Sequence, residues 1–131
     1  MIGIDTNVLV CYLAQDDPVQ STRATRIFER TLTASEPGFI NLVTMAETVW
    51  VLDRSYGMSG QKIASVIERI LQADTLVVQN EQEVFTAMAM LRSGEASFSD
   101  ALIGALGTWA GCSSTLTFGR RAARLPAFTL V

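Results

Sequence analysis

Short apolar runs alternate along this chain with longer segments in which apolar residues recur at helical spacing. The runs predict strands over residues 1–4, 39–43, 75–78, 115–118 and 128–131. The periodic segments predict helices over residues 6–14, from Pro18 onward, over 44–56, from Ser59 onward, and over 81–92 and 98–110. Because parallel strands need crossovers and cover on both faces, this order predicts an α/β fold: one domain over residues 1–131 with a parallel sheet between helical layers.

The apolar faces of three helices identify much of the expected core. The inward positions are Met45, Val49, Leu52 and Tyr56; Val84, Ala87, Met88 and Leu91; and Leu102, Ala105, Leu106 and Trp109. Gly104 and Gly107 lie inside the last of these helices, where glycine costs about 1 kcal/mol relative to alanine. We therefore expect another segment to pack closely against them.

Composition narrows the chemistry. The 131 residues are 49% hydrophobic and 18% charged, and the longest apolar runs are too short to span a membrane. No basic segment precedes an apolar stretch at the N-terminus, which favours a cytoplasmic protein without membrane attachment. Histidine is absent, so catalysis by a Ser-His-Asp triad, a Cys-His pair or a histidine zinc site is excluded.

Charge and the remaining motifs exclude further classes. Ten basic residues against 13 acidic ones give a net charge of −3, which does not indicate a general polyanion binder. The single lysine, Lys62, follows no glycine-rich phosphate-binding loop. Cys11 and Cys112 lack the spacing of metal ligands and are too few for a disulfide framework.

Three carboxylates fall where the predicted strands end and helices begin. Asp5 follows the first strand, while Glu47 and Asp100 lie in the first turns of their predicted helices. In an open parallel sheet, ligands bind at the carboxyl ends of the strands. Carboxylates gathered there would repel one another, which favours a bound Mg²⁺ or Mn²⁺ ion or a shared proton.

A structural role remains open for each of these acids. Residues 44–47, Thr-Met-Ala-Glu, match the S/T-x-x-E capping box, and residues 97–100, Ser-Phe-Ser-Asp, match its weaker aspartate form. Asp5 can likewise cap the helix that follows it. The spacing alone therefore leaves the function undecided.

The chain resembles the PIN-domain ribonucleases, in particular the VapC-type toxins of toxin–antitoxin systems. Three motifs in family order carry the resemblance: Ile4-Asp5-Thr6-Asn7-Val8-Leu9, Met45-Ala46-Glu47 and Phe98-Ser99-Asp100-Ala101-Leu102-Ile103. It implies a three-layer α/β/α sandwich with a five-stranded parallel sheet, a Mg²⁺ or Mn²⁺ site, and cleavage of single-stranded RNA by metal-activated water. It also implies a cognate antitoxin that neutralises the enzyme, and a homodimer.

The resemblance assigns roles residue by residue. Asp5, Glu47 and Asp100 would be the catalytic, metal-binding acids. Thr6 and Asn7 would orient Asp5 or a metal-bound water, and Thr117 would supply a hydroxyl at the end of the fourth strand. For Thr6, Asn7 and Thr117, the alternative is a structural role as a helix cap or in a strand-end hydrogen bond.

Two positions depart from the family pattern. Gly119 stands where the family commonly has a fourth acid, which favours one metal ion rather than two. Ser97 stands where a further aspartate is common, and its role as a helix cap accounts for it. A PIN-like protein- or RNA-binding module with weak or no catalysis is therefore the alternative function. A receiver domain is disfavoured, because it would need an acid after the third strand and a late lysine.

The basic and aromatic residues complete the picture. Arg120, Arg121 and Arg124 form the only dense basic cluster, which is either a contact for RNA or for an acidic antitoxin segment, or a solvated surface. The large aromatics are more typical of a core or dimer interface than of base stacking. They are Phe28, Trp50, Phe85 and Trp109.

Overall fold

A computed structural model describes residues 1–131 and divides the chain into two units. The first unit comprises Met1–Met58 and Arg69–Gln79, and the second comprises Ser59–Glu68 and Asn80–Val131. Helix α4 (Gly60–Gln72) contains the boundary between them. No helix has the length and apolar character that crossing a membrane requires.

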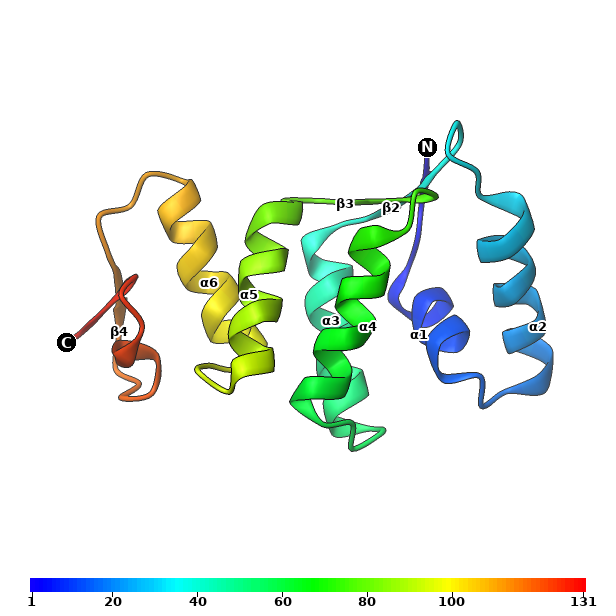
Figure 1. The fold of residues 1–131 in the computed structure, drawn as a ribbon. Helices are drawn as coiled ribbons and strands as arrows, with labels where there is room; N and C mark the ends of the chain where they lie inside the picture. Colours follow the sequence, from blue (N-terminus) through cyan, green and yellow to red (C-terminus); the bar gives the residue numbers. More distant parts are fainter. The chain divides into compact units, whose positions relative to one another are not determined.

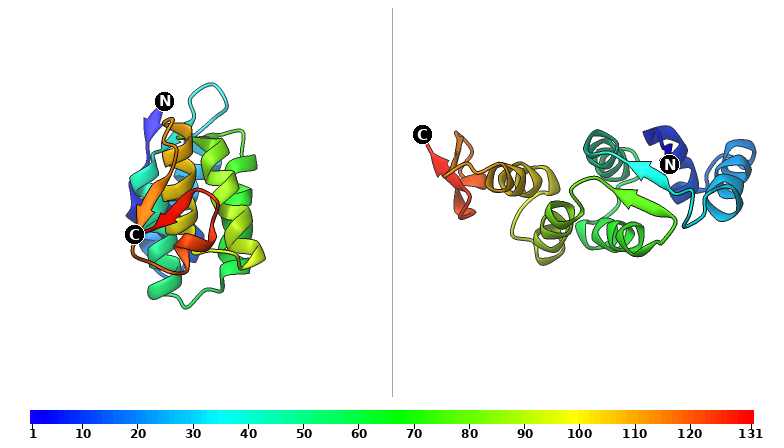
Figure 2. Two further views of the ribbon diagram at one scale, coloured as in Figure 1. Left: turned by 90° about the vertical axis from the view of Figure 1, so that its left-hand side faces the viewer. Right: turned by 90° about the horizontal axis from the view of Figure 1, so that it is seen from above.

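The first unit is built on a three-stranded parallel sheet. Its strands are β1 (Ile2–Gly3), β2 (Gly38–Ile40) and β3 (Leu76–Val78), in the order β1-β2-β3. Figure 2 shows β2 and β3 side by side. The helical elements are α1 (Thr6–Ala14), α2 (Pro18–Arg26), a π-helical turn η1 (Ile27–Thr31) and α3 (Leu42–Arg54). Helix α1 contacts both α2 and α3 (Figure 1).

Local chemistry sets where these helices begin. Asp5 and Asp17 are the N-caps of α1 and α2, and Pro18 follows Asp17 at the first helical position, where its fixed φ suits a helix start. Strand β2 ends at Ile40 because Asn41 caps α3: its side-chain oxygen accepts a hydrogen bond from the Thr44 backbone N–H at 2.8 Å. The predicted strand over 39–43 is therefore three residues too long at its end.

The second unit combines two helices with a two-stranded parallel sheet. Helices α5 (Glu81–Ser93) and α6 (Phe98–Trp109) pack on each other, and the strands β4 (Thr115–Thr117) and β5 (Phe128–Leu130) pair with each other. A 3₁₀ turn, η2 (Ala122–Arg124), lies in the connection between the strands. Figure 2 shows β4 and β5 side by side near the C-terminus.

The predicted α/β class is confirmed, but the five-stranded sheet is wrong, because the strands form separate sheets of three and two. Apolar runs indicate where strands occur but not which strands exchange backbone hydrogen bonds. Here β4 finds its partner in β5: the Thr115 N–H donates to the Ala127 carbonyl at 2.8 Å, and the Val131 N–H donates to the Thr117 carbonyl at 2.9 Å. Each unit therefore has its own small parallel sheet in place of one five-stranded sheet.

The core follows the predicted helix faces with two exceptions. Met45, Val49 and Leu52 of α3 are buried, as are Val84, Ala87 and Met88 of α5. Tyr56 lies beyond the end of α3 and donates a hydrogen bond to Asp16 Oδ2 at 2.7 Å, and Trp109 is 65% exposed. Of the other large aromatics, Phe28 is buried, whereas Trp50 and Phe85 are exposed.

The two helix glycines of α6 confirm the expectation of close packing. A Cβ on Gly104 would lie 2.7 Å from Cε2 of Phe128, and one on Gly107 would lie 2.6 Å from the Thr115 hydroxyl. Both contacts are shorter than carbon atoms tolerate. Because Gly104 and Gly107 have no side chains, the β4–β5 sheet can lie against α6 at these two positions.

Candidate active site

Asp5 lies between the end of β1 and the start of α1. Its Oδ1 accepts a hydrogen bond from the Thr6 backbone N–H at 2.7 Å, which confirms the capping role. The side chain is exposed, and Oδ2 has no hydrogen-bond partner within the protein. Capping therefore uses one oxygen and leaves the other available to a ligand.

Glu47 does not cap a helix, contrary to the capping-box alternative. Helix α3 begins at Leu42 with Asn41 as its cap, so Glu47 lies in the second turn rather than the first. Thr44, which the box would make the cap, is instead a buried residue whose hydroxyl donates to the Ile4 carbonyl at 3.4 Å. The exposed Glu47 carboxylate is thus free of any helix-end role.

Thr6 connects the two acids. Its backbone N–H donates to Asp5, and its hydroxyl donates to Glu47 Oε1 at 2.8 Å, although Glu47 is 41 residues away in the chain. One residue of α1 thereby fixes an oxygen of each carboxylate. The structure brings Asp5 and Glu47 together in the first unit through these two hydrogen bonds.

Asp100 belongs to the second unit, in the first turn of α6. Its backbone N–H donates to the Ser97 hydroxyl at 3.2 Å, which confirms Ser97 as the helix cap. The reciprocal bond of a capping box, from the Ser97 N–H to the Asp100 side chain, is not formed. The half-exposed Asp100 carboxylate therefore has no hydrogen-bond partner within the protein.

Thr117 and Gly119 form a small turn at the end of β4. The Thr117 hydroxyl accepts a hydrogen bond from the Gly119 N–H at 2.9 Å. Gly119 has no left-handed backbone angle, and a Cβ there would lie 3.3 Å from that hydroxyl oxygen. Nothing in the backbone therefore requires glycine at this position, and a side chain needs only a small shift of Thr117.

The C-terminal arginines all face solvent. Arg120, Arg121 and Arg124 are exposed, and none forms an ion pair. Three unpaired guanidinium groups within five residues of sequence make this segment of the second unit locally basic despite the net charge of −3.

The donor set of Asp5 and Glu47 suits a hard divalent cation. Mg²⁺ prefers oxygen ligands and is commonly held by one or two carboxylates, with water and substrate phosphates completing its coordination. No three Asp, Glu, Cys or His side chains gather within either unit, so the first unit offers two carboxylate ligands from these positions. The exposed, unpaired Oδ2 of Asp5 is the kind of oxygen that such an ion requires.

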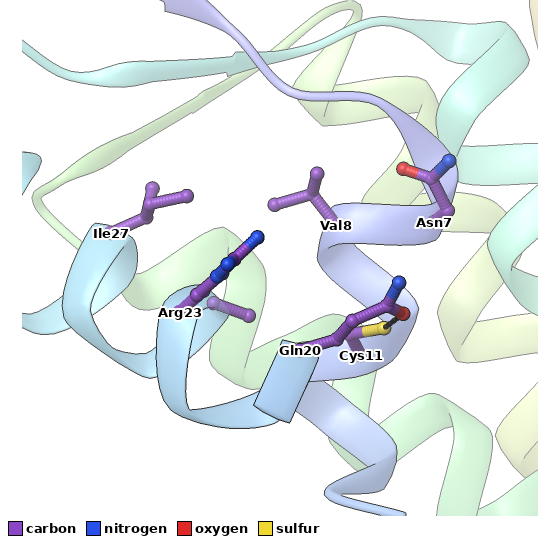
Figure 3. Close-up of a pocket in the computed structure, with 7 residues that line it drawn as sticks. Asn7, Val8, Cys11, Gln20, Arg23 and Ile27 are labelled. Atoms are coloured by element: carbon purple, nitrogen blue, oxygen red, sulfur yellow. Dashed lines mark hydrogen bonds between the residues drawn. The ribbon is translucent and has the colours of Figure 1, made fainter. Parts of the chain in front are cut away.

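A cavity of about 270 Å³ opens beside the first turn of α1, and sequence reasoning did not find it. Figure 3 shows its walls: α1 contributes Asn7, Val8 and Cys11, while α2 and η1 contribute Gln20, Arg23 and Ile27. Asn7, which was expected to assist Asp5, forms no hydrogen bond with it and lines this cavity instead.

A pair of exposed carboxylates can hold a divalent ion, and such an ion can activate a phosphodiester for hydrolysis. A family model described as the PIN domain matches residues 2–127, and this chain belongs to that family. The PIN domain is generally a nuclease fold, and the match includes residues of both units. No curated protein and no solved structure matched the chain.

Proposed function

We propose that this protein is a metal-dependent endoribonuclease toxin that cleaves single-stranded regions of RNA and is neutralised by a cognate antitoxin. The observation that carries the proposal is the hydrogen-bond bridge through Thr6, which holds Asp5 and Glu47 together with oxygens left exposed to solvent. Membership of the PIN family and the order of the three acidic motifs support the same reading.

Asp5 and Glu47 would hold the Mg²⁺ or Mn²⁺ ion, and the order of the family motifs assigns Asp100 to the same role. When bound, such an ion would polarise a phosphodiester and lower the pKa of the water bound to it, so that hydroxide is available near neutral pH. The Thr6 hydroxyl fixes Oε1 of Glu47 and leaves Oε2 free to bind the ion. Because Thr6 also holds Asp5, the two carboxylates keep their relative orientation before RNA arrives.

The partners follow from the same reasoning. Arg120, Arg121 and Arg124 are unpaired and exposed, which suits them to RNA phosphates or to an acidic segment of the antitoxin. The exposed Trp50, Phe85 and Trp109 are apolar surfaces of the kind that a homodimer buries. A cytoplasmic location fits a protein that acts on RNA.

The test compares two aspartate-to-asparagine variants. Asp5→Asn keeps the side-chain oxygen that caps α1 and removes the negative charge, so the fold should persist while RNA cleavage with Mg²⁺ or Mn²⁺ is lost. Asp17→Asn makes the same change at the cap of α2, where Oδ1 accepts from Val19 and Gln20, and should cleave RNA as the wild type does. Equal cleavage by Asp5→Asn and the wild type would refute the proposal.

Gly119 favours a second candidate, a PIN-like binding module with weak or no catalysis, because the position of a fourth acid carries no side chain. The backbone accepts a side chain there, so Gly119→Asp tests this directly. If the missing acid limits activity, the variant should bind Mn²⁺ more tightly and cleave RNA faster than the wild type. Absence of cleavage and of calorimetric Mn²⁺ binding in both proteins would establish the binding module instead.

A further inference from the structure

The cavity between α1 and α2 has an apolar floor and polar groups at its mouth. Val8, Cys11, Ala24 and Ile27 provide the apolar surface. Asn7 and Arg23 form no hydrogen bond or ion pair within the protein, and the Gln20 amide uses only its oxygen, which accepts from the Cys11 thiol at 3.4 Å. An apolar slot with a few unsatisfied polar groups is the usual form of a small-ligand site.

The charge around this cavity is positive. Arg23, Arg26 and Arg30 follow one another at intervals of three and four residues, so they share a face of α2 and η1 over about 10 Å. All three are exposed and free of ion pairs. The acid among them, Glu29, interacts with Tyr12, whose pKa is raised by burial and then by this neighbouring charge. The face therefore suits a negatively charged chain.

One residue of the cavity wall, Asn7, is close to Asp5 in the chain. The two residues are two positions apart, so their Cα atoms lie within about 7 Å of each other. Figure 3 shows Asn7 at the start of α1 and the Arg23 guanidinium pointing between Val8 and Ile27. A nucleotide that places its phosphate near Asp5 can therefore place its neighbour's base in this slot.

We infer that the cavity between α1 and α2 is a subsite for one unpaired nucleotide of the RNA, and this inference rests on the proposed ribonuclease function. The base enters the slot against Val8 and Ile27, the Gln20 and Asn7 amides bind its polar edge, and Arg23 binds its phosphate. Unpaired bases are read in this way, by contact with their faces and hydrogen bonds to their edges. Gln20 and Arg23 are thus specificity and positioning residues for the cleavage reaction.

Alkylation of the cysteines tests the inference on the unmodified protein. Cys11 lines the cavity and is half-buried, whereas Cys112 is exposed and lies in the other unit, so it serves as an internal control. Single-stranded RNA of about ten nucleotides, added without divalent ions, should slow the reaction of Cys11 with N-ethylmaleimide at least fivefold and leave Cys112 unchanged. Mass spectrometry of the peptides reports both rates.

Variants give a second readout, the fluorescence anisotropy of labelled RNA. Arg23→Gln should weaken the binding of every RNA about fivefold to tenfold. It should also reduce the slope of log affinity against log salt concentration by about 1. Gln20→Leu should reduce the ratios between the Kd values for oligo-A, oligo-C and oligo-U by at least fivefold. Arg54→Gln alters an exposed arginine of α3 that lies outside the cavity, and should bind as the wild type does.

The outcomes separate this inference from the proposed function. If the protein cleaves RNA with Mn²⁺ but RNA does not protect Cys11 and both variants bind normally, the subsite is refuted and the ribonuclease remains. If an acidic peptide of leucine and glutamate protects Cys11 while RNA does not, the cavity is a protein-binding groove and the inference is likewise overturned. Protection by RNA without cleavage supports the subsite and refutes the nuclease.

Discussion

Replacing Thr6 by valine removes the hydroxyl that donates to Glu47 while preserving the size and branching of the side chain. The lost bond is 2.8 Å long and has a carboxylate acceptor. Hydrogen bonds to charged groups contribute about 1.5 to 3 kcal/mol, and the exposure of Glu47 places this one near or below the lower end, at about 1 kcal/mol. Glu47 then loses its fixed orientation beside Asp5.

The measurable consequence is weaker metal binding. Residues that orient metal ligands typically change metal affinity by about tenfold to a hundredfold when replaced, and solvent exposure favours the lower value. We therefore expect Thr6→Val to raise the calorimetric Kd for Mn²⁺ about tenfold and to lower kcat/KM for RNA cleavage by a similar factor. The Thr6 backbone N–H still donates to Asp5, so α1 should keep its cap.

A matched control isolates the contact from the chemical change. Thr22→Val removes a hydroxyl bond of similar length, 2.7 Å to the Pro18 carbonyl, on an exposed part of α2. It should leave Mn²⁺ affinity and cleavage unchanged. Unaltered Mn²⁺ affinity in a folded Thr6→Val protein would refute the role of the bridge in holding the acids.

Three further predictions concern stability and follow from packing and titration. Thr48 is 1% exposed and its hydroxyl has no partner, so Thr48→Val should raise the free energy of unfolding by about 1 kcal/mol in urea titrations; an unchanged or lower value would contradict this. Gly104→Ala forces a Cβ against Phe128 and should lower the free energy of unfolding by about 1 to 3 kcal/mol, whereas Ser99→Ala on the exposed side of α6 should change it little; a stable Gly104→Ala protein would show that the sheet can move away. The pKa of Tyr12 is raised above 10.0 by burial and by the nearby negative charge, so its stabilising contribution is complete below pH 10 and is lost as pH rises through the folded-state pKa. Melting temperatures should therefore fall less steeply above pH 10 in Tyr12→Phe than in the wild type, and parallel curves would refute this.

The sequence predicted the elements well because their signals are local. The Asp17-Pro18 start of α2, the Ser97 cap of α6 and the buried faces of α3 and α5 each depend on residues within a turn or two. The same locality explains an error at α3. Thr-Met-Ala-Glu fits a capping box, but Asn41 is closer to the end of β2 and competes successfully for the helix start.

For the candidate site too, the sequence identified the residues and the structure identified their contacts. The sequence alone identified Asp5, Glu47 and Asp100 as candidates, because a carboxylate that interrupts an apolar stretch requires a partner or a ligand. It left both capping and ligand binding open for each of them. The structure assigns partial capping to Asp5, excludes it for Glu47 and shows a side chain without partners for Asp100.

What only the tertiary structure decided are the contacts between distant parts of the chain. Strand pairing is one, because any two apolar runs satisfy the same backbone hydrogen-bond pattern, and here the five strands separate into sheets of three and two. The Thr6–Glu47 bond spans 41 residues, and the cavity between α1 and α2 exists only when those helices pack. The sequence determined that this is an α/β chain with carboxylates between apolar segments, since periodicity and charge can be read from short stretches of sequence. Packing determined which of those acids meet and which groups remain free for a ligand, because those relations depend on three-dimensional proximity that no local pattern encodes.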